Sequence, residues 1–433
     1  MKRKYLGYII PSMLSFLLTG IYSIVDGIFV GRAMGDAGLA AINIAWPLVN
    51  LLFSLGTGIG MGAAVMVSLN KGSGNEKASL RMEGNAFTLL LMGSLILIFI
   101  LFLTGDFLLT LMGTEGEIHR HALTYLKYML LGGVFQVLAS GCVPLMRNRG
   151  ASLYSMIAMT LGCILNIILD YYFILILQME LMGAAIASVL GQSLTLLFGI
   201  VFYLRKSNRI SLTNLKPHLP SITAILKVAV SPFGLTYLPS VAILLMNLQC
   251  LKYGGEEAVS AYAVMAYLVS FVELFVQGIS DGSQPLLSLS KGKGDDKSLK
   301  SYTRWTFCLT LGLGLLSGAA TYLCRNLIPS FYGTSAEAGN LFIRYAAAFS
   351  LVMLLYGLTK PAVSYFYATH QLSYSGFLVY GEVAITVITI FVLPLLIGLE
   401  GVWLTTPLAQ LILGICSIAF LLRGQKNNRK QRY

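Results

Sequence analysis

Apolar stretches long enough to cross a lipid bilayer recur along almost the whole of this sequence. A membrane-spanning helix needs about 20 predominantly apolar residues. Only 11% of the chain is charged, whereas soluble proteins carry about 25% charged residues. The chain is therefore predicted to be an all-α integral membrane protein. Twelve transmembrane helices are predicted, over residues 6–30, 40–69, 84–112, 123–146, 153–177, 183–204, 223–251, 258–289, 301–323, 338–367, 374–396 and 399–422.

The distribution of basic residues indicates the orientation of these helices. With the N-terminus in the cytoplasm, 22 of the 30 Lys and Arg residues lie in segments on the cytoplasmic side, and 4 lie in the outer loops. Such an excess marks the cytoplasmic face of a membrane protein. We therefore expect a multi-pass protein with both termini in the cytoplasm. The same bias accounts for the net charge of +12, so no nucleic-acid partner is expected.

The second half of the chain repeats the first. At a shift of 220 residues, Ser68–Lys77 and Ser288–Lys297 are identical at six of ten positions, and Gly35 aligns with Gly255. Each half holds six predicted helices, so the two copies have the same orientation and are related by a pseudo-two-fold axis along the membrane normal. Transporters are often built from two such lobes, with the substrate site near their interface. The predicted domains are an N-terminal lobe (1–204), a cytoplasmic linker (205–222), a C-terminal lobe (223–423) and a basic cytoplasmic tail (424–433).

Four polar residues of the N-terminal lobe form a candidate cation-coupling site. Asp26 lies near the outer end of the first predicted helix, Asn166 and Asp170 lie on one face of the fifth, and Ser188 lies a few residues into the sixth. A charged side chain inside the bilayer costs roughly 2.5–3.5 kcal/mol, which favours a functional reason for keeping it. The functional interpretation is a proton or Na⁺ site at Asp26, Asn166 and Asp170. The alternative is a structural hydrogen-bond network, or carboxylates that already reach water.

The C-terminal lobe carries a second set of intramembrane charges, namely Glu273, Asp281, Lys360 and Glu382. We expect Lys360 to pair with Glu382 or Asp281, because a buried charge needs a partner. Structural pairing is the favoured interpretation for these three residues. Glu273, which has no evident cation at its depth in the sequence, is the better candidate for binding a cationic substrate or a coupling ion.

Motifs for enzymatic chemistry are absent from the sequence. There is no Gly-x-x-x-x-Gly-Lys-Ser/Thr motif for ATP, and the six cysteines are scattered without a metal-ligand spacing. No catalytic residue, resident metal or cofactor is predicted. The expected energy source is therefore an ion gradient of H⁺ or Na⁺.

Several segments together resemble the multidrug and toxic compound extrusion (MATE) family of bacterial exporters. The segments that carry the resemblance are Ile21–Arg32, Gly38–Ala41, Trp46-Pro47, Gly56–Gly60, Leu165–Asp170, Gly183–Ser188 and Gly282–Pro285. The resemblance covers essentially the whole chain, and it rests on the order and spacing of segments that are individually weak.

The resemblance implies a V-shaped pair of six-helix lobes in the bacterial cytoplasmic (inner) membrane. It also implies export of amphipathic, often cationic, drug-like molecules against H⁺ or Na⁺, with Asp26, Asn166, Asp170 and Ser188 in the cation site. We expect a monomer whose partners are these substrates and the membrane lipids. Three differences from the family pattern are a seventh helix without an acidic residue, Asp281 at a position where a neutral residue is expected, and the presence of Lys360.

Other functions are compatible with parts of this pattern. A lipid-linked oligosaccharide flippase of the same wider superfamily is the first alternative, although such proteins typically have fourteen helices and a more cationic cavity. An integral-membrane enzyme would need a catalytic or metal cluster. A channel would be distinguished by its rate of ion flux.

Overall fold

The computed structural model describes residues 1–430, apart from the side chains of Asp36 and of residues 425–430. Most of the predicted basic tail, 424–433, therefore lies outside the described side chains. The described chain is helical throughout and contains no strand. Its helices are α1 (Lys2–Gly72), α2 (Glu76–Leu111), α3 (Gly116–Leu131), α4 (Gly133–Asn148), α5 (Ser152–Asp170), the π-helix η1 (Tyr171–Ile176), α6 (Glu180–Leu204), α7 (Leu212–Leu215), α8 (Leu219–Gly292), α9 (Asp296–Leu323), α10 (Ile328–Tyr332), α11 (Ala336–Ala368), α12 (Leu372–Ile397) and α13 (Leu399–Lys430).

The predicted number of membrane spans agrees with these helices. Within the described chain, ten helices are long and apolar enough to cross a membrane when α1 is counted as two helices divided at Gly35, and the pair α3 and α4, bent by 61°, adds an eleventh if it forms one span. One of the ten, α8, has 74 residues, which corresponds to about 110 Å at 1.5 Å per residue. Because that length is more than twice the thickness of a bilayer, α8 supplies two spans and the total is twelve.

Two glycines break the longest helices at equivalent places. Gly35 inside α1 has φ 63° and ψ −148°, and Gly255 inside α8 has φ 67° and ψ −162°. Residues that carry a Cβ atom rarely adopt these backbone angles. The cytoplasmic turns that follow also match, because Gly74 and Gly294 both have positive φ. The repeat predicted from the sequence is thus confirmed in the local backbone.

The described chain forms two compact units. Unit 1 comprises Met1–Tyr237 with Ser288–Asp296, and unit 2 comprises Leu238–Leu287 with the chain from Lys297 onward. The division falls inside α8, so the first part of this helix belongs to unit 1. Close backbone packing holds it there: a Cβ atom built on Gly62 of α1 would lie only 2.7 Å from the carbonyl oxygen of Ile225. The predicted lobe boundaries at 204 and 223 stay a prediction.

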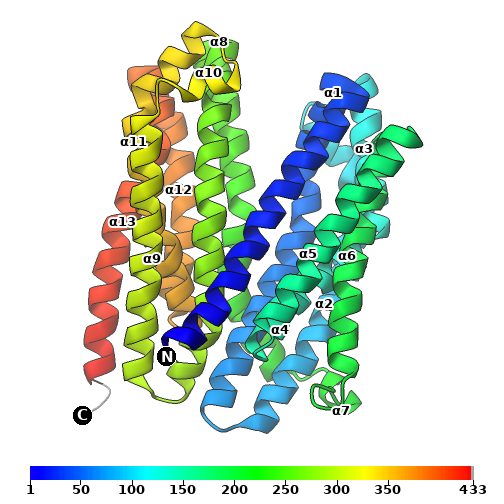
Figure 1. Ribbon diagram of the computed structural model, residues 1–433, viewed down its shortest axis with the longest axis vertical. Coiled ribbons are helices and arrows are strands. Elements are labelled where there is room, and N and C mark those ends of the chain that lie inside the picture. The colour runs from blue at the N-terminus through cyan, green and yellow to red at the C-terminus, as the bar shows by residue number, and fades with distance from the viewer. Residues whose placement is uncertain (431–433) are drawn as a thin grey trace. The chain divides into compact units, whose positions relative to one another are not determined.

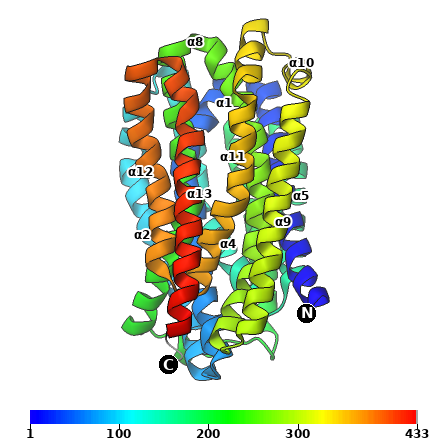
Figure 2. The same ribbon diagram turned by 90° about the vertical axis from the view of Figure 1, so that its left-hand side faces the viewer.

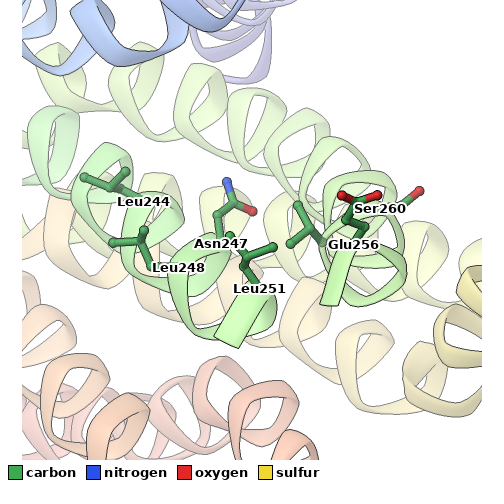
Figure 3. Close-up of a pocket in the computed structure, with 7 residues that line it drawn as sticks. Leu244, Asn247, Leu248, Leu251, Glu256 and Ser260 are labelled. Carbon is green, nitrogen blue, oxygen red and sulfur yellow. The ribbon is translucent and has the colours of Figure 1, made fainter. Parts of the chain in front are cut away.

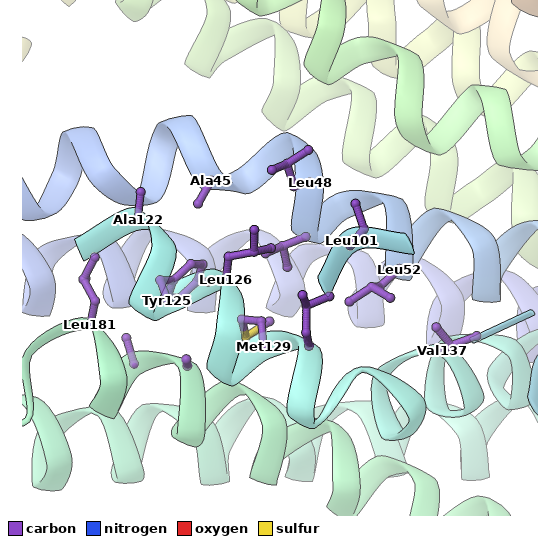
Figure 4. Packing of buried hydrophobic residues seen from close by; sticks show 14 of the residues in the cluster. Ala45, Leu48, Leu52, Leu101, Ala122, Tyr125, Leu126, Met129, Val137 and Leu181 are labelled. Atoms are coloured by element: carbon purple, nitrogen blue, oxygen red, sulfur yellow. The ribbon is translucent and has the colours of Figure 1, made fainter. Parts of the chain in front are cut away.

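The core of unit 1 is formed by apolar side chains from α1, α2, α3, α4 and α6. Figure 4 shows Ala45, Leu48 and Leu52 of α1 facing Leu126 and neighbouring side chains of α3. Helix α5 packs against both α1 and α6, and α5 and α6 can be followed side by side in Figure 1. These contacts fix the helices that carry the predicted N-terminal cation site.

Unit 2 is centred on a buried tryptophan. Trp403 of α13 is fully buried, stacks on Tyr345 with ring centroids 4.8 Å apart, and makes edge contacts with Tyr262 and Phe349. Helices α12 and α13 run side by side, as Figure 2 shows, and both contact α11. The packing of these three helices positions the charged residues of the C-terminal lobe.

Candidate functional site

The residues of the predicted N-terminal site lie on three helices of unit 1. Asp26 lies on α1, Asn166 and Asp170 lie on α5, and Ser188 lies on α6. Asn166 is 3% exposed and Asp170 is fully buried. The Asn166 side-chain amide donates a hydrogen bond of 3.5 Å to the Ser188 hydroxyl. The carboxyl groups of Asp26 and Asp170 are close enough to interact electrostatically. The structure therefore brings together the residues that the sequence singled out.

This site contains buried oxygen atoms that have no hydrogen-bond partner. They are Asp26 Oδ1, Asn166 Oδ1 and both carboxylate oxygens of Asp170. Within the described chain, no Lys, Arg or His side chain forms an ion pair with Asp26 or Asp170. A buried carboxylate without a donor or a counter-ion is strongly disfavoured. Carboxylate and amide oxygens are suitable ligands for a hard cation, and a carboxylate can alternatively bind a proton, so this donor set suits either Na⁺ or H⁺.

The backbone changes its hydrogen-bond pattern directly after Asp170. The π-helix η1 begins at Tyr171, and the Tyr171 ring meets the Phe29 ring of α1 with centroids 6.3 Å apart. Short π-helical turns occur mostly within α-helices and are frequent at functional sites. The connection to α6 is also unusual, because the non-glycine residues Gln178 and Glu180 have φ values of 51° and 53°. The segment after Asp170 is thus held in an uncommon conformation.

Two tyrosines near the N-terminal carboxylates are not among the residues that the sequence predicts for this site. Tyr22 and Tyr125 both interact electrostatically with Asp26 and Asp170, and Tyr125 is 2% exposed. Tyr22 precedes Asp26 by four residues, so the two share a helix face and the spacing was a usable signal. Tyr125 comes from α3, and nothing in the sequence places it beside α1.

The charged residues of the C-terminal lobe form a cluster around Lys360. The Lys360 Nζ atom lies 2.7 Å from Glu273 Oε1 and 3.5 Å from Glu382 Oε2. The expected pairing with Glu382 is present. The expectation that Glu273 has no cation at its depth is wrong, because Lys360 of α11 reaches across to α8. Counting residues along a helix estimates the depth of each backbone position in the membrane. It does not show how far, or in which direction, a lysine side chain extends from that position.

Asp281 makes different contacts. It accepts a hydrogen bond of 2.6 Å from the Gln277 side-chain amide and one of 3.3 Å from the Tyr367 hydroxyl. Its side chain is 4% exposed. These neutral donors compensate the buried carboxyl group of Asp281.

A shallow pocket of about 380 Å³ lies along α8 near its break at Gly255. Figure 3 shows the leucines Leu244, Leu248 and Leu251 on one side of it and Glu256 with Ser260 on the other. Glu256 and Ser260 are exposed. None of the predicted site residues lines this pocket, so it is separate from both charged clusters.

Known proteins match the chain over nearly its full length. The multidrug export protein MepA of Staphylococcus saprophyticus is 27% identical over 428 residues, which cover 96% of this chain and 93% of that protein. MepA of Staphylococcus aureus strain NCTC 8325 is 25% identical over 423 residues, or 95% of this chain and 91% of that protein. Both are named as exporters, in agreement with the predicted absence of enzymatic function.

Solved structures share the fold. A MATE crystal structure in the bent conformation has a TM-score of 0.90 at 20% identity, covering 100% of this chain and 97% of that chain. A variant of the Vibrio cholerae MATE transporter VcmN has a TM-score of 0.89 at 18% identity, covering 99% and 97%. The MatE family model matches residues 11–172 and 236–399, in both halves of the repeat. Because these segments make up well over half of the sequence, the chain belongs to the MatE family of multidrug export transporters.

Proposed function

We propose that this chain exports amphipathic, often cationic, small molecules by antiport against H⁺ or Na⁺, and that Asp26 and Asp170 carry the coupling ion. The single observation that carries this proposal is the set of buried, unpartnered oxygens on Asp26, Asn166 and Asp170. The names of the staphylococcal relatives support the choice of drug-like substrates.

The chemistry of the site supports an exchangeable ion. A permanent Lys or Arg partner would neutralise Asp170 and leave no place for a cation. Within residues 1–430 neither Asp26 nor Asp170 has such a partner, and the groups near them include the Ser188 hydroxyl, the Asn166 amide and the phenols of Tyr22 and Tyr125. Binding of H⁺ or Na⁺ removes the cost of the buried charge. Release of the ion restores that cost, so the occupied and empty states favour different surroundings of the carboxylates.

The location of the protein follows from the same proposal. An exporter driven by an ion gradient must lie in a membrane that maintains one. We place the chain in the bacterial cytoplasmic membrane, with both termini on the cytoplasmic side, because 22 of its 30 basic residues would then face the cytoplasm. The protein would act as a monomer surrounded by membrane lipids.

Transport by proteoliposomes tests this proposal. A fluorescent cationic drug is loaded, H⁺ and Na⁺ gradients are imposed separately, and the drug efflux of the wild type is compared with that of Asp26→Asn and Asp170→Asn. We expect one of the two gradients to drive efflux by the wild type. Both variants should lose at least about 90% of gradient-driven efflux, because a carboxamide carries no negative charge and cannot take up and release a coupling cation as a carboxylate does. Elution as a single sharp peak in gel filtration verifies that the variants are folded.

Asp106→Asn is the matched control. Asp106 is also on a helix of unit 1, but its side chain is 69% exposed and contacts His119. This variant should keep its efflux. Unchanged gradient-driven efflux in Asp26→Asn or Asp170→Asn would remove that residue from the coupling site.

A further inference from the structure

The cluster around Lys360 has an unbalanced charge. Two carboxyl groups, those of Glu273 and Glu382, face one ammonium group. Within the described chain, no other Lys or Arg pairs with either carboxyl group. With all three groups ionised, the cluster carries a net charge of −1. A buried excess charge is unfavourable unless a cation compensates it.

The two carboxyl groups have different surroundings. Glu382 of α12 is held from two sides, by Lys360 and by the Gln410 side-chain amide, which donates a hydrogen bond of 2.7 Å to Glu382 Oε1. The Thr359 hydroxyl donates to Gln410 Oε1 at 3.1 Å, which fixes the orientation of that amide. Among the described residues, Glu273 has Lys360 as its only hydrogen-bonding or ionic partner. Glu382 therefore has two polar partners, whereas Glu273 has one, the Lys360 ammonium, which lies nearer to Glu273 than to Glu382.

The cluster is buried on the lysine side and open on the carboxyl side. The Lys360 side chain is 2% exposed, whereas those of Glu273 and Glu382 are 19% and 23% exposed. The Lys360 ammonium also lies 4.8 Å from the centre of the Tyr356 ring, where a cation–π interaction favours its charged form. Lys360 is thus a charged group that is locked in place, while both carboxyl groups remain partly exposed.

From this geometry we propose that Glu273 binds the positively charged group of an organic cation, and that Lys360 limits the site to a single positive charge. Lys360 acts as a tethered counter-ion that permanently neutralises one of the two carboxylates. One negative charge remains for the ligand, so monocations fit the cluster and dications leave one charge uncompensated. This inference rests on the proposed export function only in taking the ligand to be an amphipathic cation.

Equilibrium binding with two probes of the same chain length tests the assignment. Decyltrimethylammonium carries one quaternary ammonium group, and its bis-quaternary analogue, N-decyl-N,N,N′,N′,N′-pentamethylpropane-1,3-diammonium, carries a second one three carbons away, close enough for both to reach the cluster. Binding of both is measured by isothermal titration to purified protein in lipid nanodiscs, without any ion gradient. The variants are Glu273→Gln, Lys360→Met and the double variant Glu273→Gln/Lys360→Met. Glu337→Gln, which changes an exposed acidic residue in the first turn of α11, is the matched control.

The charge count predicts the direction of each change. Glu273→Gln leaves a net charge of zero and should weaken monocation binding about tenfold or more. Lys360→Met leaves −2 and should strengthen binding of the bis-quaternary probe about tenfold more than decyltrimethylammonium binding. The double variant returns to −1 and should bind the monocation within about threefold of the wild type, because Glu382 then supplies the charge. Glu337→Gln should bind both probes as the wild type does.

A purely structural ion pair predicts a different pattern. Unchanged affinity in a folded Glu273→Gln protein, an equal effect of Lys360→Met on both probes, or a wild type that binds neither probe would each overturn the inference. If Lys360→Met does not fold, Glu273→Gln and the charge-balanced double variant still decide the question. A failure of gradient-driven export would contradict the proposed function and leave these binding results standing.

Discussion

Two ion pairs of similar composition differ greatly in their burial. Arg149, which caps the end of α4, forms a bidentate pair with Glu83 of α2, and the Tyr203 hydroxyl donates a hydrogen bond of 2.8 Å to the same carboxylate. The Glu83 side chain is 1% exposed. The pair of Arg344 and Glu400 is 62% and 50% exposed. Burial should decide how much each carboxylate contributes to stability.

We expect Glu83→Gln to lower the free energy of unfolding by about 3–5 kcal/mol, because it leaves the buried Arg149 without its counter-ion. Glu400→Gln is the matched control and should change stability by at most about 1 kcal/mol, as exposed pairs do. Unfolding by sodium dodecyl sulfate in mixed micelles measures both. Equal losses in the two variants would show that burial is not what makes the Glu83 pair important.

Individual partners were the part of the site that the sequence could predict least. Asp26, Asn166, Asp170 and Ser188 were found because polar residues stand out in apolar helices. The contact between Lys360 and Glu273 depends on how α8 and α11 pack and on the direction of a long side chain, which no local pattern specifies.

At the scale of the helices, the breaks at Gly35 and Gly255 show how the repeat is built into the backbone. Both residues have positive φ in the middle of otherwise helical segments. A Cβ atom on Gly35 would meet no atom within 4 Å. Any cost of a side chain at this position must therefore come from the backbone conformation and not from crowding.

Gly35→Ala should accordingly destabilise the protein by about 1–3 kcal/mol, the usual cost of an L-residue held in a sparsely populated conformation. Gly312→Ala on α9 is the control, since its Cβ would also meet nothing and its φ is ordinary. That substitution should be neutral or stabilising by up to about 1 kcal/mol, because alanine favours helices. Thermal unfolding compares the two variants, and a Gly35→Ala protein as stable as Gly312→Ala would contradict the strain argument.

The linker between the repeats is attached to α2 by hydrogen bonds of Asn85 and Thr88. The Asn85 amide donates hydrogen bonds to the carbonyl oxygens of Asn214 and Lys216, at 3.2 and 3.3 Å. Its side-chain oxygen accepts one of 2.8 Å from the backbone N–H of His218. The Thr88 hydroxyl adds a bond of 2.7 Å to the carbonyl oxygen of Leu215. Residues 214–218 of the linker, which we call the strap, are therefore bound to α2 and do more than connect the two repeats.

Asn85→Ala should release the strap, because three of its hydrogen bonds are lost together. The linker contains trypsin sites at Arg205, Lys206 and Arg209, so limited proteolysis should cut it about tenfold faster in this variant. Thr213→Ala is the control, since Thr213 contacts Ser211 within the linker itself. Equal cleavage rates in Asn85→Ala and the wild type would contradict docking by Asn85.

These elements mark the limits of prediction from the sequence. The spans and the repeat were predictable because apolar length and glycine spacing are summed over many residues. The π-helix after Asp170 and the strap were not. The first depends on a shift of a few backbone hydrogen bonds, and the second on Asn85, whose partners lie about 130 residues further along the chain.

At the scale of the whole molecule, we propose different tasks for the two charged clusters. The N-terminal carboxylates Asp26 and Asp170 have no basic partner within residues 1–430 and suit a small coupling ion. The C-terminal cluster keeps a lysine as a permanent counter-ion and suits one organic cation. In exchange transport, binding of the coupling ion must be linked to binding of the organic cation. Each ligand can shift the equilibrium between two conformations of the protein only if it binds them with different affinities.

The most direct test of this central claim measures ion movement that is driven by the substrate. Proteoliposomes receive a gradient of a cationic drug and no ion gradient, and the internal pH and the uptake of radioactive sodium are followed. The account predicts that drug movement through the wild type drives H⁺ or Na⁺ in the opposite direction, and that Asp26→Asn and Asp170→Asn abolish this ion movement. Drug transport by the wild type without any counter-movement of ions, or undiminished ion movement in both variants, would contradict it.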